Sequence, residues 1–283
     1  MKPGRLYLVA TPIGNLEDLT LRALRVLKEV DVIACEDTRH SRLLLNRHGI
    51  SGQLVSYHEH NEQHRASELL KRLQAGESVA LVSDAGTPAL SDPGYVLIRR
   101  AIDENIPVVP VPGPSAVTAA LTVSGLAPDR FLFLGFLPRR ADERRRALRE
   151  VAAVPWTLVM FEAPHRIAGT LADLYATLGD RRMALVRELT KRFEEVQRGT
   201  VAEVLDRIRT TPPRGELTLV VEGAQAEQPT ELEVGTQLKE LLTGGKPPKD
   251  AVHIVAQAHR IPKRAVYQLM LEILGKRESA QGR

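Results

Sequence analysis

The chain has 283 residues, of which 43% are hydrophobic and 26% charged, and its formal net charge at pH 7 is +4. This is the balance of an ordinary globular protein with a sizeable core, and the length predicts about two domains. One cysteine, Cys35, excludes an internal disulfide and is interpreted as a small buried residue on a strand. The sequence shows no signal peptide and no run long enough to cross a bilayer, so we expect a cytoplasmic protein without membrane contact.

Apolar segments of strand length alternate with helical patterns in the first half of the chain. The helical patterns cover residues 21–30 and 68–73. The predicted strands are residues 5–10, 31–36, 54–57, 78–83 and 107–111. This alternation predicts an α/β fold with a mostly parallel sheet and helices on both of its faces.

Gly125, Pro128 and Asp129 interrupt this pattern, and a second α/β segment follows. It contains a predicted helix at 167–178 and predicted strands at 131–136, 156–161, 183–187, 194–199 and 216–222. Beyond Gln225, a linker precedes helical patterns only, and those at 249–259 and 266–273 are expected to pack as a hairpin. We therefore predict α/β domains at 1–124 and 125–224, followed by a linker and helical hairpin module at 225–283.

Ligands of open parallel sheets bind beyond the carboxyl ends of the strands, so the loops at that edge are the candidate site. Residues 10–15 form a loop of small residues that suits either close ligand approach or a tight turn, and it does not match Gly-x-Gly-x-x-Gly. Residues 83–94 exceed the two to six residues of a plain connection and offer backbone donors and a carboxylate. At 112–116, two prolines precede a helix whose N-cap is expected to be Ser115.

Two further loops carry charged groups. Glu36, Asp37 and Arg39 either cap a helix, with Arg39 pairing to an acid, or form a polar cluster that faces the substrate. His58 and His60 lie on one face if the strand continues through them. Their spacing lacks the further ligands of a zinc site, so we expect no metal and favour a rim that contacts the substrate.

Taken in order, seven motifs carry a family resemblance: Thr-Pro-Ile-Gly-Asn, Glu-Asp-Thr-Arg, His-Glu-His-Asn-Glu, Ser-Asp-Ala-Gly-Thr-Pro, Val-Pro-Gly-Pro-Ser-Ala, Phe-Glu-Ala-Pro-His-Arg and Arg-Glu-Leu-Thr-Lys. Together they resemble the ribosomal RNA small subunit methyltransferase I family of the tetrapyrrole methylase superfamily, over about residues 5–223. The C-terminal hairpin also resembles that family's helical module.

The resemblance implies a two-domain tetrapyrrole-methylase-like fold, a mixed second sheet, and S-adenosyl-L-methionine bound between the domains. It implies a homodimer that methylates the ribose 2′-oxygen of a cytidine in the decoding centre of 16S ribosomal RNA. The implied substrate is either the 16S RNA itself or the small ribosomal subunit. Matched by motif, the residues implied to contact the cofactor are Pro12, Ile13, Asp84, Ala85, Gly86, Thr87, Ser115, Ala116, Phe161, Leu189 and Thr218.

Two other functions stay open at this point. One is a superfamily enzyme that methylates a tetrapyrrole or a protein side chain, although Thr-Pro-Ile-Gly-Asn replaces the Gly-x-Gly-Pro-Gly-Asp of tetrapyrrole enzymes in the first loop. The other is a ribosome-associated protein that keeps the cofactor cleft without turnover. The basic tail and the first loop favour the RNA enzyme over the other superfamily activities.

A ribose hydroxyl is a very weak acid, so a general base is expected to matter, and acidic or histidine side chains near the loops are candidates. They are Glu36, Asp37, His58, Glu59 and Asp84. We favour an acid from Glu36 and Asp37, with Arg39 fixing a phosphate.

RNA binding needs positive charge beyond the reaction centre. One basic segment contains Arg139, Arg140, Arg144, Arg145, Arg146 and Arg149, and the alternative for it is a solvated helix face. The preferred RNA contact is the C-terminal hairpin with Lys246, Lys249, Lys263 and Arg264.

Overall fold

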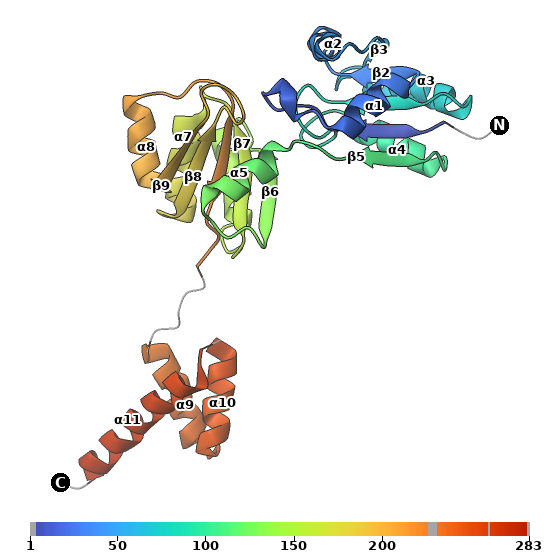
Figure 1. Ribbon diagram of the computed structural model, residues 1–283. Coiled ribbons are helices and arrows are strands. Elements are labelled where there is room, and N and C mark those ends of the chain that lie inside the picture. Colours follow the sequence, from blue (N-terminus) through green and yellow to red (C-terminus); the bar gives the residue numbers. More distant parts are fainter. Residues whose placement is uncertain (1–3, 226–230, 260, 282–283) are drawn as a thin grey trace. The chain divides into compact units, whose positions relative to one another are not determined.

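The computed structural model describes residues 4–225, 231–259 and 261–281. The chain forms two compact units, residues 1–224 and 225–283. The first unit contains two five-stranded sheets, and the second contains helices (Figure 1). In the described part of the chain, no helix combines the length and the hydropathy needed to cross a membrane.

The first sheet is parallel throughout, with strand order β3-β2-β4-β1-β5. Its strands are β1 (Leu6–Val9), β2 (Val32–Cys35), β3 (Gln53–Ser56), β4 (Val79–Val82) and β5 (Val108–Val111). The intervening helices are η1 (Leu16–Asp18), α1 (Leu21–Glu29), α2 (Thr38–Arg47), α3 (Glu62–Gln74) and α4 (Tyr95–Asp103).

Both faces of this sheet are covered, which explains its nearly continuous apolar strands. On one face, Leu69 and Leu73 of α3 pack with Leu97 of α4, and on the other, Leu27 of α1 packs with Leu44 of α2. The helices that follow the neighbouring strands β1 and β4 thus lie on opposite faces (Figure 1). Ligands of open α/β sheets bind at the carboxyl edge where such a reversal occurs, which here is the edge that carries the loops after β1 and β4.

The second sheet has the order β6-β7-β10-β8-β9 and is mixed, since β6 and β7 run parallel and the other pairs antiparallel. Its strands are β6 (Phe131–Phe136), β7 (Thr157–Glu162), β8 (Arg182–Arg187), β9 (Glu195–Thr200) and β10 (Leu217–Val221). Three helices pack on one face: α6 (Ala141–Glu150), α7 (Ile167–Leu178) and α8 (Val201–Thr210).

Helix α5 (Ala116–Ser124) connects the two sheets. It follows β5 of the first sheet, yet its buried residues Val117, Ala120 and Leu121 pack on the free face of the second sheet (Figure 1). The N-terminus of α5 therefore lies where the loops of the first sheet meet the second. The division of this unit at residue 125 stays a prediction, and α5, which it assigned to the first domain, packs on the second sheet.

The second unit consists of α9 (Glu231–Thr243), α10 (Pro248–His259) and α11 (Lys263–Gln281). Leu238, Val255 and Val266, one from each helix, are fully buried and belong to a single apolar cluster. The expected hairpin of α10 and α11 is therefore completed by a third helix.

The fold class is confirmed: a parallel sheet with helices on both faces, a mixed second sheet and C-terminal helices. Each predicted strand lies within one or two residues of an observed one. Cys35 is buried at the end of β2, as expected. Helix ends follow local signals, such as the Thr200 hydroxyl and the Glu203 carboxylate, which cap the start of α8 reciprocally.

Candidate functional site

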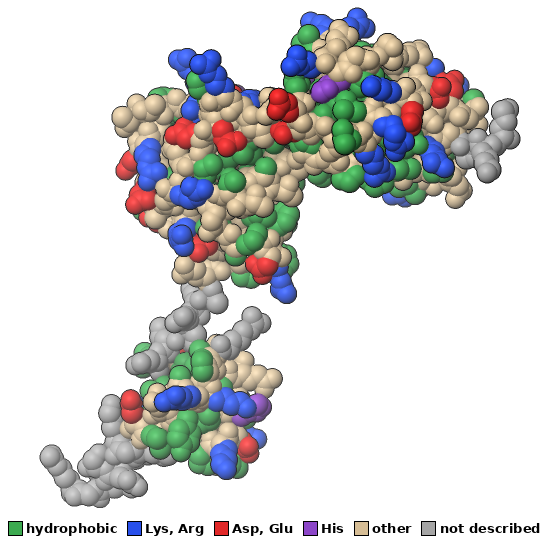
Figure 2. All heavy atoms as spheres, viewed as in Figure 1, with side chains coloured by type: hydrophobic (Ala, Val, Ile, Leu, Met, Phe, Trp, Pro, Cys, Tyr) green, Lys and Arg blue, Asp and Glu red, His purple; other side chains and the backbone are tan. Residues whose placement is uncertain are grey.

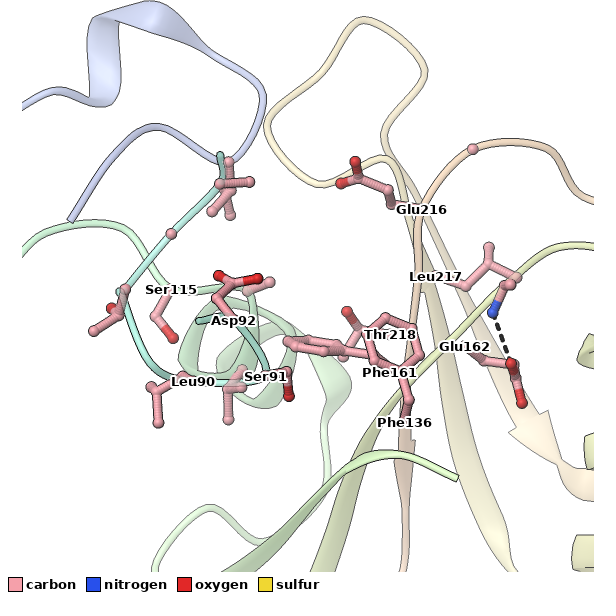
Figure 3. A pocket seen from close by; sticks show the side chains of 18 of the residues that line it. Leu90, Ser91, Asp92, Ser115, Phe136, Phe161, Glu162, Glu216, Leu217 and Thr218 are labelled. Carbon is pink, nitrogen blue, oxygen red and sulfur yellow. Dashed lines mark hydrogen bonds between the residues drawn. The ribbon is translucent and has the colours of Figure 1, made fainter. Parts of the chain in front are cut away.

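A cavity of about 350 Å³ lies between the loops of the first sheet and the open edge of the second (Figure 3). This volume is within the range of small-molecule sites. The first sheet contributes the loops after β1 and β4 and the turn before α5, and the second contributes the ends of β6, β7 and β10. The lining includes Ile13, Ala85, Gly86, Thr87, Leu90, Ser91, Asp92, Ser115, Ala116, Phe136, Phe161, Glu162, Glu216 and Thr218.

The loops after β1 and β4 are joined through their backbones. Thr11 and Gly86 form an isolated β-bridge, in which each N–H donates to the other residue's carbonyl, at 2.9 and 3.1 Å. The buried Thr11 hydroxyl also donates to the Ser83 carbonyl at 3.0 Å. Gly86 has φ +86°, and a Cβ there would approach Ile13 Cγ2 to 3.3 Å. A glycine thus brings the backbone close to any molecule in the cavity.

The start of α5 provides hydrogen-bond donors to the cavity. Ser115 is the N-cap residue, as predicted, but its side chain makes no capping hydrogen bond. Ser115, Ala116 and Val117 line the cavity. The first N–H groups of a helix lack partners within the helix, and together with its dipole they favour an anionic group such as a carboxylate.

The opposite wall is aromatic. The ring of Phe161 lies 5.1 Å from that of Phe133 and 5.5 Å from that of Phe136, measured between centroids. Beside it, the buried Glu162 carboxylate accepts hydrogen bonds from the Ala163 N–H at 2.7 Å and the Thr170 hydroxyl at 2.5 Å. The carboxylate also pairs with Arg166 at 3.2 Å, and because these contacts occupy Glu162 we assign it to shaping the wall.

Most residues predicted to contact the cofactor lie on this cavity. Those on its wall are Ile13, Ala85, Gly86, Thr87, Ser115, Ala116, Phe161 and Thr218. Leu189 lines a small adjoining cavity with Thr218. Pro12 is buried and lines neither cavity. Asp84 lines neither, and its carboxylate accepts the N–H of Asp37 at 3.1 Å, tying the loops after β4 and β2 together.

A second cavity of about 400 Å³ has an acidic lining. Its wall consists of Glu36, Glu59, Glu62, Ser91, Asp92, Pro93, Gly94 and Tyr95. Burial raises the pKa of Glu36, and the negative charge of Asp84 raises it further. Carboxylates crowded in this way repel phosphate and accept hydrogen bonds from hydroxyl or amino groups.

Ser91 and Asp92 line both cavities, and they were not among the predicted site residues. The pKa of Asp92 is raised to about 6, mainly by burial and next by the charge of Glu36, while a hydrogen bond with Ser83 opposes the rise. The unusual length of loop 83–94 was the available signal for both residues. Leu90, Phe136 and Glu162 were also missed, and nothing local distinguishes the two apolar residues from ordinary core residues.

Of the two alternatives that the sequence left open, Asp37 and Arg39 form the helix cap with an ion pair. Asp37 is the N-cap of α2 and accepts the Arg39 N–H at 2.8 Å. The two side chains also pair at 3.1 Å, and 91% of the Arg39 side chain is exposed. The hydrogen bonds from Arg39 lower the pKa of Asp37, which makes Asp37 a weaker base than an ordinary aspartate.

His58 lies after β3 in a turn, so the expectation that the strand continues to place His58 and His60 on one face is wrong. Asn61 fixes the turn: its amide oxygen accepts the His58 N–H at 2.9 Å, and its amide nitrogen lies 3.0 Å from His58 Nε2. That contact makes Nε2 the acceptor. The two imidazoles lie 5.9 Å apart in an edge-on arrangement. Within the described residues, no group of three or more histidine, cysteine or acidic side chains is arranged to hold a metal.

The prediction of a basic RNA contact over residues 139–149 is wrong at one position. Arg144 is buried, and its guanidinium pairs with Asp173 at 2.5 Å, so it is a core residue rather than a surface contact. Arg139 and Arg140 are exposed. Arg140 lies 3.7 Å from both Asp142 and Glu143. Figure 2 shows Lys and Arg side chains scattered over the viewed face of the first unit.

In the second unit, the four predicted basic residues are exposed. Lys246 precedes α10, Lys249 lies in its first turn, and Lys263 and Arg264 begin α11. Figure 2 shows basic and apolar side chains side by side on the viewed face of this unit.

Comparison with known proteins identifies close relatives. The chain is 46% identical over 270 residues to the ribosomal RNA small subunit methyltransferase I of Streptococcus pyogenes serotype M1, with 94% of each chain covered. It is also 46% identical over 275 residues to the protein of the same name from Escherichia coli O157:H7, with 96% of each covered. The chain belongs to the ribosomal RNA small subunit methyltransferase I family.

Family models agree with this membership. The tetrapyrrole (corrin/porphyrin) methylase model matches residues 5–205, which span both sheets up to α8. The RsmI C-terminal HTH domain model matches residues 228–274, which include α9 and α10. The methyltransferase I family thus combines the superfamily fold with the three-helix unit seen here.

Solved structures of other proteins share the fold of the first unit of this chain. Uroporphyrin-III C-methyltransferase from Thermus thermophilus, complexed with S-adenosylhomocysteine, matches with a TM-score of 0.55 and 25% identity, covering 77% of this chain and 97% of that one. Diphthine synthase matches with a TM-score of 0.59 at 15% identity, covering 78% and 90%. At that identity, the second match supports the fold alone.

Proposed function

We propose that this chain transfers a methyl group from S-adenosyl-L-methionine to the ribose 2′-oxygen of a cytidine in the decoding centre of 16S ribosomal RNA. The observation that carries the proposal is 46% identity, over 94% or more of both chains, to proteins named for methylating small-subunit ribosomal RNA. These matches cover 94–96% of this chain, whereas the solved tetrapyrrole and diphthine enzymes cover 77–78% of it.

The cavity that Phe161 and the start of α5 line, which we name the donor cavity, fits the proposed methyl donor. S-adenosylmethionine combines a flat purine, ribose hydroxyls, and an amino acid end with a carboxylate. The Phe161 wall suits the purine, and the free N–H groups at the start of α5 suit the carboxylate. Gly86 allows a ligand to reach the backbone of the loop. The related Thermus thermophilus enzyme was solved with the demethylated product of the same donor.

The acidic cavity fits the proposed acceptor. A nucleoside presents hydroxyl donors on its ribose, and cytosine adds an exocyclic amino group, all of which carboxylates accept. Glu36, Glu59 and Glu62 are available for such bonds, and their charge keeps phosphates outside the cavity. The exposed Arg39 lies in the first turn of α2, three residues after Glu36, and is proposed to contact a phosphate of the RNA once Asp37 releases it.

Affinity for the ribosomal RNA is proposed to come from exposed cations outside both cavities. In the first unit, Arg139 and Arg140 provide this exposed positive charge. Lys246, Lys249, Lys263 and Arg264 serve the second, whose match to a helix-turn-helix family model supports a nucleic-acid contact. We also propose, from the family resemblance alone, that two copies of the chain form a homodimer.

The proposed chemistry places few demands on the protein. When bound, S-adenosylmethionine supplies an electrophilic methyl group on a sulfonium sulfur. The chain's residues hold the acceptor hydroxyl in line with that group, exclude water between the two walls, and remove one proton. Such positioning contributes up to about 7–11 kcal/mol of barrier reduction, and a general base a further factor of about 10²–10⁴.

The proposal is tested by incubating the full chain with methyl-labelled S-adenosylmethionine and purified small ribosomal subunits. The expected result is label in 16S RNA, in a cytidine whose 3′ phosphodiester resists alkaline cleavage. Label in a base, in ribosomal protein, or in an added tetrapyrrole instead would contradict the proposal. Light scattering of the same preparation decides whether the chain is a dimer.

A further inference from the structure

The two cavities meet at one carboxylate. Asp92 lines both the donor cavity and the acidic cavity, and it is the only acidic residue that the described linings of the two share. In Figure 3, Asp92 and Ser115 lie on the side of the first sheet, and Phe161 and Thr218 lie on the other side. A group at this position reaches toward both a methyl donor and an acceptor.

The backbone around Asp92 holds a strained conformation. Ala89 has φ +67° and Ser91 has φ +64°, values that non-glycine residues rarely adopt. Gly94 has φ +149° and is packed so tightly that a Cβ would lie 2.9 Å from Leu81 Cδ2. Strain of about 1–3 kcal/mol per such residue persists where the surroundings fix the chain, and it concentrates at functional sites.

We propose that Asp92 is the catalytic base, accepting the proton of the ribose hydroxyl as the methyl group is transferred; this rests on the proposed function. The acceptor oxygen forms a bond to the methyl carbon while the bond from that carbon to the sulfonium sulfur breaks. The hydroxyl proton passes to an Asp92 carboxylate oxygen. One positive charge on sulfur and one negative charge on Asp92 disappear together, and the carboxyl later releases its proton to water.

The charges around Asp92 suit this role. Glu36, Glu59, Glu62 and Tyr95 face the acidic cavity, Glu162 and Glu216 line the donor cavity, and Asp84 lies nearby. Among the described linings there is no Lys or Arg to stabilise the carboxylate. The resulting pKa of about 6 leaves Asp92 ionised at neutral pH but a stronger base than an ordinary aspartate.

Asp92 is preferred to the acids expected from the sequence because of where each lies. Glu36 lines the acidic cavity alone, so it faces an acceptor without reaching the donor cavity. Asp37 is engaged as the cap of α2, and Asp84 is engaged by the Asp37 N–H. We therefore assign to Glu36 the role of raising the proton affinity of Asp92.

The first test compares single-turnover methyl transfer to small subunits by wild type, Asp92→Asn, Asp92→Glu and Asp103→Asn. Asp103 is a matched control because it is an exposed aspartate on α4 that pairs with Arg99. We expect Asp92→Asn to lose about 100-fold or more in rate, Asp92→Glu to recover part of it, and Asp103→Asn to match wild type. The wild-type rate should fall below pH 6. A wild-type rate in Asp92→Asn would overturn the assignment.

The second test measures binding without turnover. Calorimetry compares S-adenosylmethionine, which carries the sulfonium charge, with neutral S-adenosylhomocysteine. If the Asp92 carboxylate lies beside the reacting centre, Asp92→Asn lowers the preference for the charged ligand about fivefold at pH 8, and much less at pH 5. An unchanged preference contradicts the assignment. The binding measurement tests the position of Asp92 even if the wild-type chain does not methylate RNA. A failure of the wild-type chain to methylate RNA would contradict the proposed function instead.

Discussion

The two cavities share a wall but are built in opposite ways. The lining of the donor cavity is mostly aromatic and small side chains, with a glycine at positive φ and a helix N-terminus, and its three acids, Asp92, Glu162 and Glu216, are a minority. The acidic cavity has four carboxylates, which favour hydrogen-bond donors. The difference suggests that one cavity recognises its ligand by shape and backbone contacts, and the other by side-chain charge.

The largest effect that would sharpen this contrast is expected at Phe161. Replacing its ring by the Phe161→Ala change removes most of the apolar wall, and we expect the affinity for S-adenosylhomocysteine to fall about 10- to 100-fold. Calorimetry measures this. Phe133→Ala is the matched control, because that ring also contacts Phe161 but does not line the cavity. Equal losses in the two variants would mean that packing, rather than ligand contact, explains the effect.

A tenfold effect is expected for Gly86→Ala, in comparison with Gly49→Ala. Both glycines have positive φ, at +86° and +63°, so each change should cost about 1–2 kcal/mol of stability. A Cβ at Gly86 crowds Ile13, whereas one at Gly49 has nothing within 4 Å. The affinity for S-adenosylhomocysteine should therefore drop about tenfold in the first variant only. Similar affinities in both would argue against close backbone contact.

A smaller effect is expected when the acidic cavity loses one charge. Glu59→Gln should raise the KM for small subunits about threefold, because a charged acceptor is replaced by a neutral one. The affinity for S-adenosylhomocysteine should not change. Glu29→Gln is the control, since Glu29 is an exposed glutamate on α1 that pairs with Arg25. A loss of donor affinity in Glu59→Gln would break the division of roles between the cavities.

The smallest effect concerns stability and pH. The pKa of Glu36 is raised in the folded chain by burial and by Asp84, so its protonated form is stabilised there. Stability from this group is present below its unfolded pKa and is lost as pH rises through the raised value. We expect Glu36→Gln to melt roughly 1–3 °C higher than wild type at pH 8 and no higher at pH 4. Calorimetric melting in both buffers checks the sign.

Much of the fold was predictable because its signals are local. Strand-length apolar runs, such as that of β4, and cap residues, such as Thr200, mark the elements within a residue or two. The loops that line the donor cavity were also predictable, because parallel strands bring their carboxyl ends to one edge.

The roles of several side chains depend on contacts between distant parts of the chain, and these could not be predicted from the sequence. Asp92 looks like any turn residue until the burial of loop 83–94 raises its pKa. Arg144 sits in a run of arginines, and only its contact with Asp173 on α7 shows that it belongs to the core. The sequence around Asp37 is equally compatible with a helix cap and with a group that faces the substrate. The structure shows that its side chain caps α2.

The paired amides of Thr11 and Gly86 have a consequence for how the donor cavity opens. Because each loop supplies both a donor and an acceptor to the other, neither can swing outward without exposing unsatisfied backbone groups of its partner. The loops after β1 and β4, more than seventy residues apart in the chain, therefore behave as a single cooperative unit. A ligand that immobilises one of them also slows the hydrogen exchange of the other.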